Sequence, residues 1–309
     1  MRRIAAGLVV ICGLAVVASI EGAQFGIPFT HPSKTASPSQ KDVARVQQAT
    51  TPQQAAEAGY DGGLRFCRVQ FNTSPEGDGA GWFVDYPQAD ENLSIRLSQL
   101  TKLPITTVGE GDPVHLVLRL SETELFQCPW VMMTEPGGAD LSEAEAKRLG
   151  EYLRKGGFLW ADDFWGTHAW EWWSMQLAKA LPPGEFPIVD VPIDHPMFHT
   201  MFDIKEIPQI PNIGQWVSTH TTSERGADSP RAYARAIFDK KGRLMVFMTF
   251  DTDFGDSFER ETESPDYFQN FSVPAYEIAA DVLIYALTHW ANPKSQIPNP
   301  KSQANPGCG

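Results

Sequence analysis

The pattern of hydrophobic and polar positions in the middle of the chain predicts strands separated by helices. Residues 64–71 (LRFCRVQF) alternate apolar and polar side chains, which is typical of a strand. Residues 90–101 instead place Leu93, Leu97 and Leu100 on one face of a helix. Further strands are expected at residues 114–120, 130–133, 158–161 and 244–250, and a long, mostly apolar helix at residues 275–290.

The best-defined helix precedes the strand at residues 158–161. Asp140 and Glu143 have the spacing of a capping box, an apolar face follows them, and Gly156-Gly157 ends the helix. Strands that alternate with helices of this length predict a parallel sheet covered on both faces. We therefore expect an α/β fold with a doubly wound, mostly parallel sheet.

The N-terminal part of the chain has a different composition. Arg2 and Arg3 precede an apolar run at residues 4–20, which predicts a secretory signal peptide over residues 1–23. The alternative is an uncleaved membrane anchor, because the run is close to the shortest length that spans a bilayer. Residues 24–58 are rich in Pro, Ser, Gln and Thr, so a disordered linker is expected there.

The other end of the chain resembles this linker. Residues 291–309 repeat a short Asn-Pro-Lys-Ser-Gln segment and lack core-forming side chains, which predicts a disordered tail. A single α/β domain is therefore expected over residues 59–290. The sequence predicts an exported protein, periplasmic or extracellular, that stays attached to the membrane if its N-terminal segment is not cleaved.

Charge and cysteine content exclude two classes of partner. The formal net charge of −13 gives an acidic surface that repels phosphate, so nucleic acid is not an expected partner. None of the four cysteines forms a Cys-x-x-Cys pair, which argues against structural zinc. Cys67 and Cys128 either form a disulfide in an oxidising compartment or remain as buried thiols in neighbouring strands.

Acidic residues and one histidine stand in loops that can meet at one edge of the predicted sheet. Ligands of open parallel sheets bind beyond the carboxyl ends of the strands. The pocket candidates are Asp85, Asp162, Asp163, His195, Asp251 and Asp253. Such a set suits acid–base work, a divalent cation or a polyhydroxylated ligand. The plainer interpretation is that each Asp caps a helix or ties a loop.

No cofactor and no metal ligands are assigned from the sequence, although a divalent cation is compatible with the Asp-rich edge. Residues 251–256 (DTDFGD) have the look of a calcium loop, but Gly255 and Thr262 stand where the EF-hand pattern requires other residue types. Five tryptophans between residues 160 and 173 either form a stacking platform for a flat ligand or, as we expect for most of them, pack a helix onto the sheet.

Several short motifs together resemble a bacterial family described as domain of unknown function 4159. They are Gly81-Trp82, Asp85-Tyr86-Pro87, Asp90, Gly156-Gly157-Phe158, Asp162-Asp163-Phe164-Trp165-Gly166, Asp194-His195-Pro196 and Asp253-Phe254-Gly255-Asp256. More distantly, residues 141–163 resemble class I glutamine amidotransferases and trehalose-utilisation-like proteins. That resemblance implies a class I glutamine amidotransferase-like (flavodoxin-like) fold. It also places Asp163 where those amidotransferases have their cysteine, which excludes thiolate attack on glutamine.

Two functional hypotheses follow. The first is an extracytoplasmic ligand-binding or assembly module, which takes a small polar ligand or a cell-envelope protein partner at the Asp-rich edge. The second is a hydrolase for a carbohydrate or related polar substrate, with Asp163 as base or nucleophile and His195 as its partner. An enzyme of this kind needs Asp163 and His195 within hydrogen-bond reach or one water apart. We favour the first because no complete catalytic constellation is present in the sequence.

Overall fold

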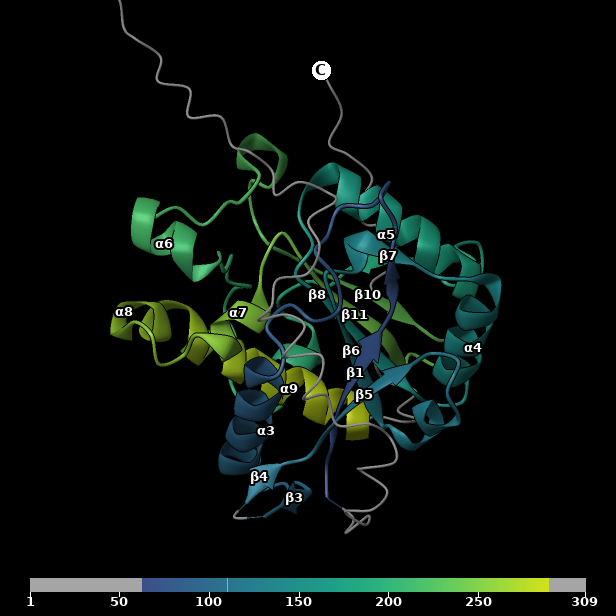
Figure 1. Ribbon diagram of the computed structural model, residues 1–309, viewed down its shortest axis with the longest axis horizontal. Coiled ribbons are helices and arrows are strands. Elements are labelled where there is room, and N and C mark those ends of the chain that lie inside the picture. The colour runs from purple at the N-terminus through teal and green to yellow at the C-terminus, as the bar shows by residue number, and fades with distance from the viewer. Residues whose placement is uncertain (1–62, 110, 289–309) are drawn as a thin grey trace, which may run out of the picture. The chain divides into compact units, whose positions relative to one another are not determined.

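The computed structural model describes residues 63–109 and 111–288 (Figure 1). The predicted signal peptide (1–23), linker (24–58) and tail (291–309) lie outside the described residues.

A seven-stranded sheet forms the centre of the domain. Its strands are β1 (Phe66–Gln70), β5 (His115–Arg119), β6 (Trp130–Thr134), β8 (Phe158–Asp162), β9 (Val189–Asp190), β10 (Tyr233–Phe238) and β11 (Leu244–Phe250). The neighbours run in the order β5-β1-β6-β8-β11-β10-β9. The first five pair in parallel, whereas β10 pairs antiparallel with both β11 and β9. The expected α/β fold with a mostly parallel sheet is confirmed.

The order of the parallel strands determines where a ligand site can form. Numbered along the chain, the five strands lie in the order 2-1-3-4-5, which is the order of a doubly wound sheet. The order reverses between β1 and β6, so loops at their carboxyl ends part and leave a crevice. β6 and β8 are paired from Trp130↔Phe158 to Thr134↔Asp162, so these two strands end level with each other.

Helices cover both faces of the sheet, as Figure 1 shows. α4 (Glu143–Arg154) and α5 (Gly166–Ala180) pack on one face, and α3 (Gln88–Thr101) and α9 (Val273–Thr288) on the other. Successive strand residues alternate between the two cores, because strand side chains alternate between faces. In β8, for example, Phe158 and Trp160 join one core, and Leu159 and Ala161 join the other.

Smaller elements fill the connections. They are β2 (Asn72–Thr73) paired with β7 (Ala139–Asp140), β3 (Thr107–Val108) paired with β4 (Asp112–Pro113), α6 (Ile213–Thr219), α7 (Phe254–Glu259), α8 (Pro265–Tyr267), the π-helical turn η5 (Phe268–Ser272), and the 3-10 turns η1 (Thr123–Gln127), η2 (Pro136–Gly138), η3 (Pro196–Phe198) and η4 (Gly226–Asp228). The helical run from α8 through α9 is long and apolar enough to cross a membrane, but 67% of its most apolar window is buried within the domain. It is therefore a core element of the domain.

The start of α4 differs from the sequence prediction. The capping box is formed by Ser142 and Glu145, and not by Asp140 and Glu143. The Ser142 side chain accepts a hydrogen bond from the Glu145 amide, and the Glu145 carboxylate accepts one from the Ser142 amide. The helix begins two residues later than expected because Asp140 is still paired in β7.

The two open alternatives for the cysteines are resolved in favour of a disulfide. Cys67 lies on β1 and Cys128 immediately before β6, and their sulfur atoms are bonded. The bond links positions 61 residues apart in the sequence.

Candidate functional site

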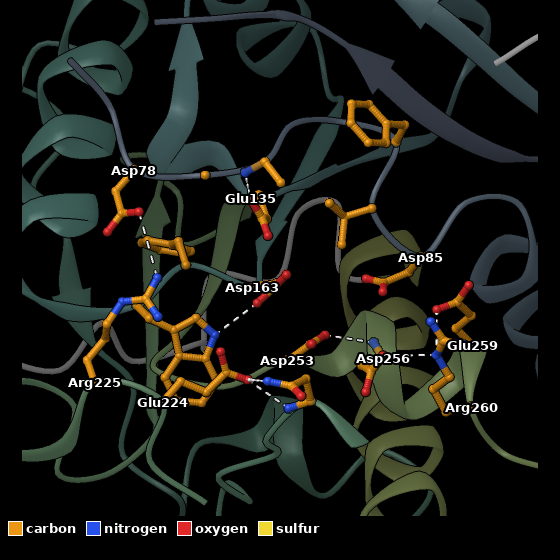
Figure 2. A pocket seen from close by; sticks show the side chains of 17 residues that line it. Asp78, Asp85, Glu135, Asp163, Glu224, Arg225, Asp253, Asp256, Glu259 and Arg260 are labelled. Carbon is orange, nitrogen blue, oxygen red and sulfur yellow. Dashed lines mark hydrogen bonds and ion pairs between the residues drawn. The ribbon is translucent and has the colours of Figure 1, made fainter. Parts of the chain in front are cut away.

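The candidate site is a pocket of about 420 Å³ at the carboxyl ends of β1, β6, β8 and β11. Its charged lining residues are the carboxylates Asp78, Asp85, Glu135, Asp163, Glu224, Asp253, Asp256 and Glu259 and the arginines Arg225 and Arg260 (Figure 2). We call this set of residues the acidic pocket. Of the predicted candidates, Asp85, Asp163 and Asp253 line it, and Asp162, Asp251 and His195 do not.

Three neighbouring parallel strands end in the same way. Glu135, Asp163 and Asp251 are the first residues after β6, β8 and β11, and each has a left-handed backbone with φ of 50°, 57° and 58°. Non-glycine residues adopt this conformation rarely, and Asp does so more easily than most. The turn ends the side-chain alternation of the strand and presents Glu135 and Asp163 to the acidic pocket.

Asp163 does not cap the helix that follows it. Its Oδ1 accepts a hydrogen bond of 2.9 Å from the Trp165 indole, and the N-cap of α5 is Trp165 with no side-chain cap. The side chain is only 6% exposed. Burial, and then the nearby carboxylates of Glu135 and Asp85, raise the pKa of Asp163 well above its ordinary value.

Asp162, the preceding residue, is fully buried and is held from two sides. Its Oδ1 accepts a hydrogen bond from the Thr249 hydroxyl of β11, and its Oδ2 accepts one of 2.9 Å from the Gly255 amide at the start of α7. Burial raises the pKa of Asp162 to about 7, although these hydrogen bonds oppose the rise. The predicted pocket residue Asp162 thus fixes α7 to the sheet beneath the acidic pocket.

Asp251 also ties elements together. Its Oδ1 accepts a hydrogen bond of 2.8 Å from the Gly166 amide, the first residue of α5, and its amide donates to the Phe164 carbonyl. This is the loop-tying role that the plainer interpretation of the sequence describes.

The loop after β1 presents Asp85, and a buried arginine shapes this loop. Arg68 Nη1 donates to the carbonyls of Trp82 and Val84, at 3.1 and 3.0 Å, while the rest of its guanidinium forms a buried ion pair with Asp90. Burial, followed by the carboxylate of Asp256, raises the pKa of Asp85 well above its ordinary value. Arg68 is a positioning residue that the sequence analysis missed, because an arginine within a strand gives no sign of a ligand site.

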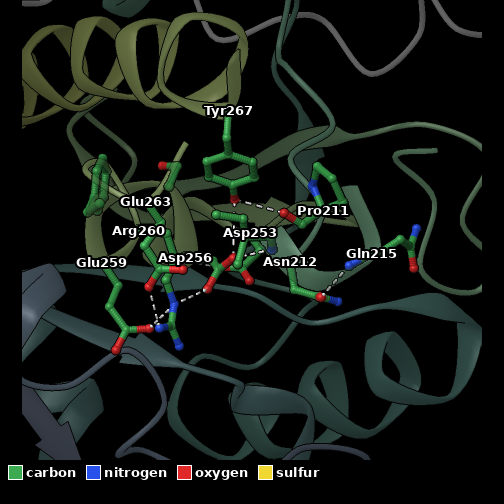
Figure 3. Close-up of polar contacts among 12 residues, drawn as sticks. Pro211, Asn212, Gln215, Asp253, Asp256, Glu259, Arg260, Glu263 and Tyr267 are labelled. Carbon is green, nitrogen blue, oxygen red and sulfur yellow. Dashed lines mark hydrogen bonds and ion pairs between the residues drawn. The ribbon is translucent and has the colours of Figure 1, made fainter. Parts of the chain in front are cut away.

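α7 carries the acidic residues on the opposite side of the pocket from Glu135 (Figure 2). Figure 3 shows their polar contacts. Asp253 is its N-cap and accepts from the Asp256 amide at 2.7 Å. Asp256 Oδ2 accepts hydrogen bonds from the Ile213 amide at 2.6 Å and from the Tyr267 hydroxyl at 3.3 Å. Arg260 pairs with Asp256, and it also pairs with its neighbours Glu259 and Glu263.

Residues 212–225 close the remaining side of the pocket. Glu224 accepts hydrogen bonds from the backbone amide and the side chain of Asn212, and Arg225 lies 3.7 Å from the Asp78 carboxylate. Neither Glu224 nor Arg225 was predicted, because neither is adjacent to a strand. Glu135, in contrast, lies two residues after the strand predicted at residues 130–133, as Asp163 does after the strand predicted at 158–161, so the rule that selected Asp163 would also have found it.

The structure does not bring His195 together with Asp163. The chain turns at residues 192–195, and the His195 ring packs against Phe238 and Tyr285, with ring centroids 5.5 and 5.6 Å away. Phe238 pairs with Leu244, the first residue of β11, so His195 lies toward the other end of the sheet. Its Nδ1 accepts from the Met197 amide and caps a 3-10 turn.

Residues 65–287 match the model of the family described as Domain of unknown function (DUF4159). The chain belongs to this family. The match covers the whole sheet and all residues of the acidic pocket, so the site is part of the DUF4159 domain. A search of curated proteins finds no match.

The DUF4159 domain holds these carboxylates in a setting that disfavours their charge. Burial raises the pKa of Glu135 to about 7 and that of Asp256 to about 6, and it raises the pKa of Asp253 well above the ordinary value. Mutual repulsion adds to this effect, since the carboxylates of Asp163 and Asp85 also raise the pKa of Asp253. A cation in the pocket would lower these pKa values and release protons as it binds.

The side chains in the pocket also limit its chemistry. Among the described residues that line it there is no histidine, serine, cysteine or lysine. Carboxyl groups are therefore the side chains of this lining that can transfer a proton or attack as a nucleophile.

Proposed function

We propose that this DUF4159 protein is an extracytoplasmic binding module whose acidic pocket takes a small polar ligand with a cationic group, such as an amine or a guanidinium. The observation that carries the proposal is the charge of the lining, which has eight carboxylates and two arginines. Both arginines already face carboxylates, Arg225 at Asp78 and Arg260 at Asp256 and Glu259. The carboxyl groups of the lining therefore outnumber its arginines, and because the pKa of several of them is raised, a cationic ligand would favour their ionised form and release protons as it binds.

The size and walls of the pocket suit a small ligand. Its volume of about 420 Å³ lies within the range of about 300–1,000 Å³ that is usual for small-molecule sites. Phe83, Phe164 and Trp165 supply aromatic surface beside the carboxylates. Aromatic rings attract cations over their faces, so these walls favour the same kind of ligand.

The backbone around Asp163 supports a likeness to the class I glutamine amidotransferase-like scaffold. The strand order 2-1-3-4-5 and the left-handed turn directly after β8 are the features expected of that likeness. With Asp163 at the turn in place of cysteine, the scaffold serves binding and not thiolate chemistry.

The disulfide between Cys67 and Cys128 supports export. Disulfides form and persist in oxidising compartments such as the bacterial periplasm and the extracellular space. Together with Arg2, Arg3 and the apolar run after them, this favours a product shortened by about two dozen residues. Intact-mass analysis of periplasmic and cytoplasmic fractions tests this, and full-length protein confined to the cytoplasm would contradict it.

Matched pairs of ligands test the binding proposal. We would titrate the purified protein with putrescine and 1,4-butanediol, with arginine and citrulline, and with glucosamine and N-acetylglucosamine. The expected result is that at least one amine or guanidine binds while its neutral partner does not, and that added salt weakens the binding. Asp163→Asn and Glu135→Gln should each weaken it about tenfold or more. Binding that is equal within every pair, or absent from all of them, would overturn the proposal.

The alternative proposal, a hydrolase, would have to use two carboxyl groups in place of Asp163 and His195. Glu135, with its pKa raised to about 7, and the nearby Asp163 are the residue types that glycoside hydrolysis requires. Because His195 packs elsewhere, Asp163 has no imidazole partner among the described residues that line the pocket. Turnover of aryl glycosides that disappears in both Asp163→Asn and Glu135→Gln would favour this function over binding alone.

A further inference from the structure

Three aspartates gather on the α7 side of the acidic pocket. Asp85, Asp253 and Asp256 each offer an oxygen atom, and these three atoms lie within 4.8 Å of one another. All three side chains are buried, at 4%, 4% and 5% exposure. We call them the three-aspartate cluster.

Part of this cluster is explained by the fold. Asp253 caps α7, and Asp256 accepts from the Ile213 amide and Tyr267 hydroxyl and pairs with Arg260. If these two residues were the whole cluster, a structural role would account for it.

Asp85 requires a different explanation. Its Oδ2 is buried and has no hydrogen-bond partner within the described residues. A buried carboxylate oxygen without a partner costs free energy unless something in the native state offsets the loss of water. Asp85 Oδ2 also lies directly over the first turn of α7, since a Cβ atom added to Gly255 would stand 2.1 Å from it. The fold therefore brings this oxygen to the segment between Asp253 and Asp256, where none of the described residues bonds it.

We propose that the three-aspartate cluster binds a hard divalent cation of the calcium and magnesium class. Three carboxylates and no nitrogen or sulfur donor form the ligand set that such cations prefer. Calcium–oxygen bonds of about 2.3–2.6 Å allow two ligand oxygens to lie up to about 5 Å apart across one ion, which fits the spacing of the cluster. The open side of the pocket leaves room for water or ligand oxygens in the remaining coordination positions.

This inference deepens the proposed function and rests on the same pocket. The cation would occupy the α7 end, and Asp163, Glu135 and Glu224 would remain for the organic ligand (Figure 2). A bound cation would also hold the loop after β1 against α7, because Asp85 belongs to that loop and Asp253 and Asp256 to α7.

Titration with the metal alone tests the inference without an organic ligand. The protein is treated with EDTA, dialysed, and titrated with calcium chloride and, separately, with magnesium chloride by calorimetry. We expect saturable binding of one ion per chain, with a Kd of about 10⁻⁴–10⁻³ M or tighter. Asp85→Asn should weaken it at least about tenfold. Asn keeps the left-handed backbone at position 85, where φ is 61°, so this variant should fold.

Two further variants show whether cation binding depends on the net charge of the protein or on the position of the Asp85 carboxylate. Asp140→Asn removes one exposed carboxylate outside the pocket and should bind the cation as the wild type does. Gly255→Ala keeps every charge but displaces the Asp85 carboxylate, so it should weaken binding like Asp85→Asn.

Two results would overturn the inference. They are the lack of saturable binding by wild-type protein up to about 10 mM of either cation, and unchanged affinity in Asp85→Asn. Failure of the proposed function looks different, because amine binding could be lost in Asp163→Asn, or be absent throughout, while cation binding persists.

Discussion

Asp162 and Asp163 are adjacent in the chain, but their carboxylates have opposite surroundings. Asp162 accepts hydrogen bonds from Thr249 and Gly255 inside the domain, and Asp163 lines the acidic pocket with one bond from Trp165. The left-handed backbone of Asp163 separates the two side chains at the end of β8. One residue of this pair therefore holds the fold and the other is available to a ligand.

Substitution at the two positions should affect stability differently. Asp163→Asn retains the acceptor for Trp165, tolerates the left-handed backbone and removes a charge that burial disfavours. We expect a change within about 1 kcal/mol, in the stabilising direction at pH 8. Asp162→Ala leaves Gly255 and Thr249 without their shared acceptor and should cost about 2–4 kcal/mol. Urea unfolding measures both, and equal losses would contradict the division of roles.

Glu135 should make the stability of the protein depend on pH. Its pKa is raised from 4.5 to about 7, so the native state holds a proton that the unfolded chain has lost. The contribution of a neutral Glu135 is fully present below about pH 4.5 and is lost as the pH rises through about 7.

Glu135→Gln should remove this loss. The variant should unfold like the wild type at pH 4 and be more stable at pH 8, by roughly 1–2 kcal/mol because the side chain is only partly buried. Glu206→Gln, at an exposed position, is the control and should show no such difference. The measurement is the free energy of unfolding across this pH range, and a stabilisation that is equal at both pH values would refute the assignment.

The disulfide should contribute strongly to stability. Closing a loop between positions 61 residues apart is worth about 4 kcal/mol in the chain-entropy model. Cys67→Ser combined with Cys128→Ser should lose most of this, and reduction of the wild type should lower its Tm to a similar extent. Mass analysis after alkylation counts the free thiols, and finding both cysteines alkylated in unreduced protein would contradict the pairing.

Substitution of Arg68 should destabilise the protein more than the position of this residue within a strand suggests. Its guanidinium bonds Asp90 and the carbonyls of Trp82 and Val84 at the same time, which the single ammonium of lysine cannot do. Arg68→Lys should cost about 2–4 kcal/mol. It should also loosen the loop that presents Asp85, so cation binding should weaken. Arg119→Lys, at the surface end of β5, is the control and should cost less than about 0.5 kcal/mol.

The parallel part of the fold was predictable from the sequence because its strands and helices are marked by neighbouring residues, such as apolar runs and helix-ending glycines. The strand expected at residues 244–250 is β11 with the same bounds, and the helix that ends at Gly156-Gly157 is α4. β9 and β10 were not predicted, because nothing in their residues indicates that the chain reverses direction at this edge of the sheet.

The site was predictable only where it lies in a loop that follows a predicted strand. Asp85, Asp163 and Asp253 were found through their positions after predicted strands. Asp256 was noted only as part of the 251–256 loop, although it meets Asp85 and Asp253. His195 was selected by its Asp-His-Pro motif, and its turn runs back over the sheet face that α9 covers. The residues around His195 do not indicate that the chain turns back over the sheet.

The left-handed backbone at Asp85 and Asp163 makes the shape of the pocket independent of the charge at these two positions. Asparagine adopts this backbone about as readily as aspartate. Substitution of Asp85 or Asp163 by Asn therefore removes one carboxyl group at a time from the pocket and leaves the backbone unchanged. Under the proposed function, point mutations at these positions would shift the preference of the pocket from cationic toward neutral ligands without a misfolded intermediate. A β-branched residue at either position would not be tolerated in this way, so natural variation there should be confined to a few residue types.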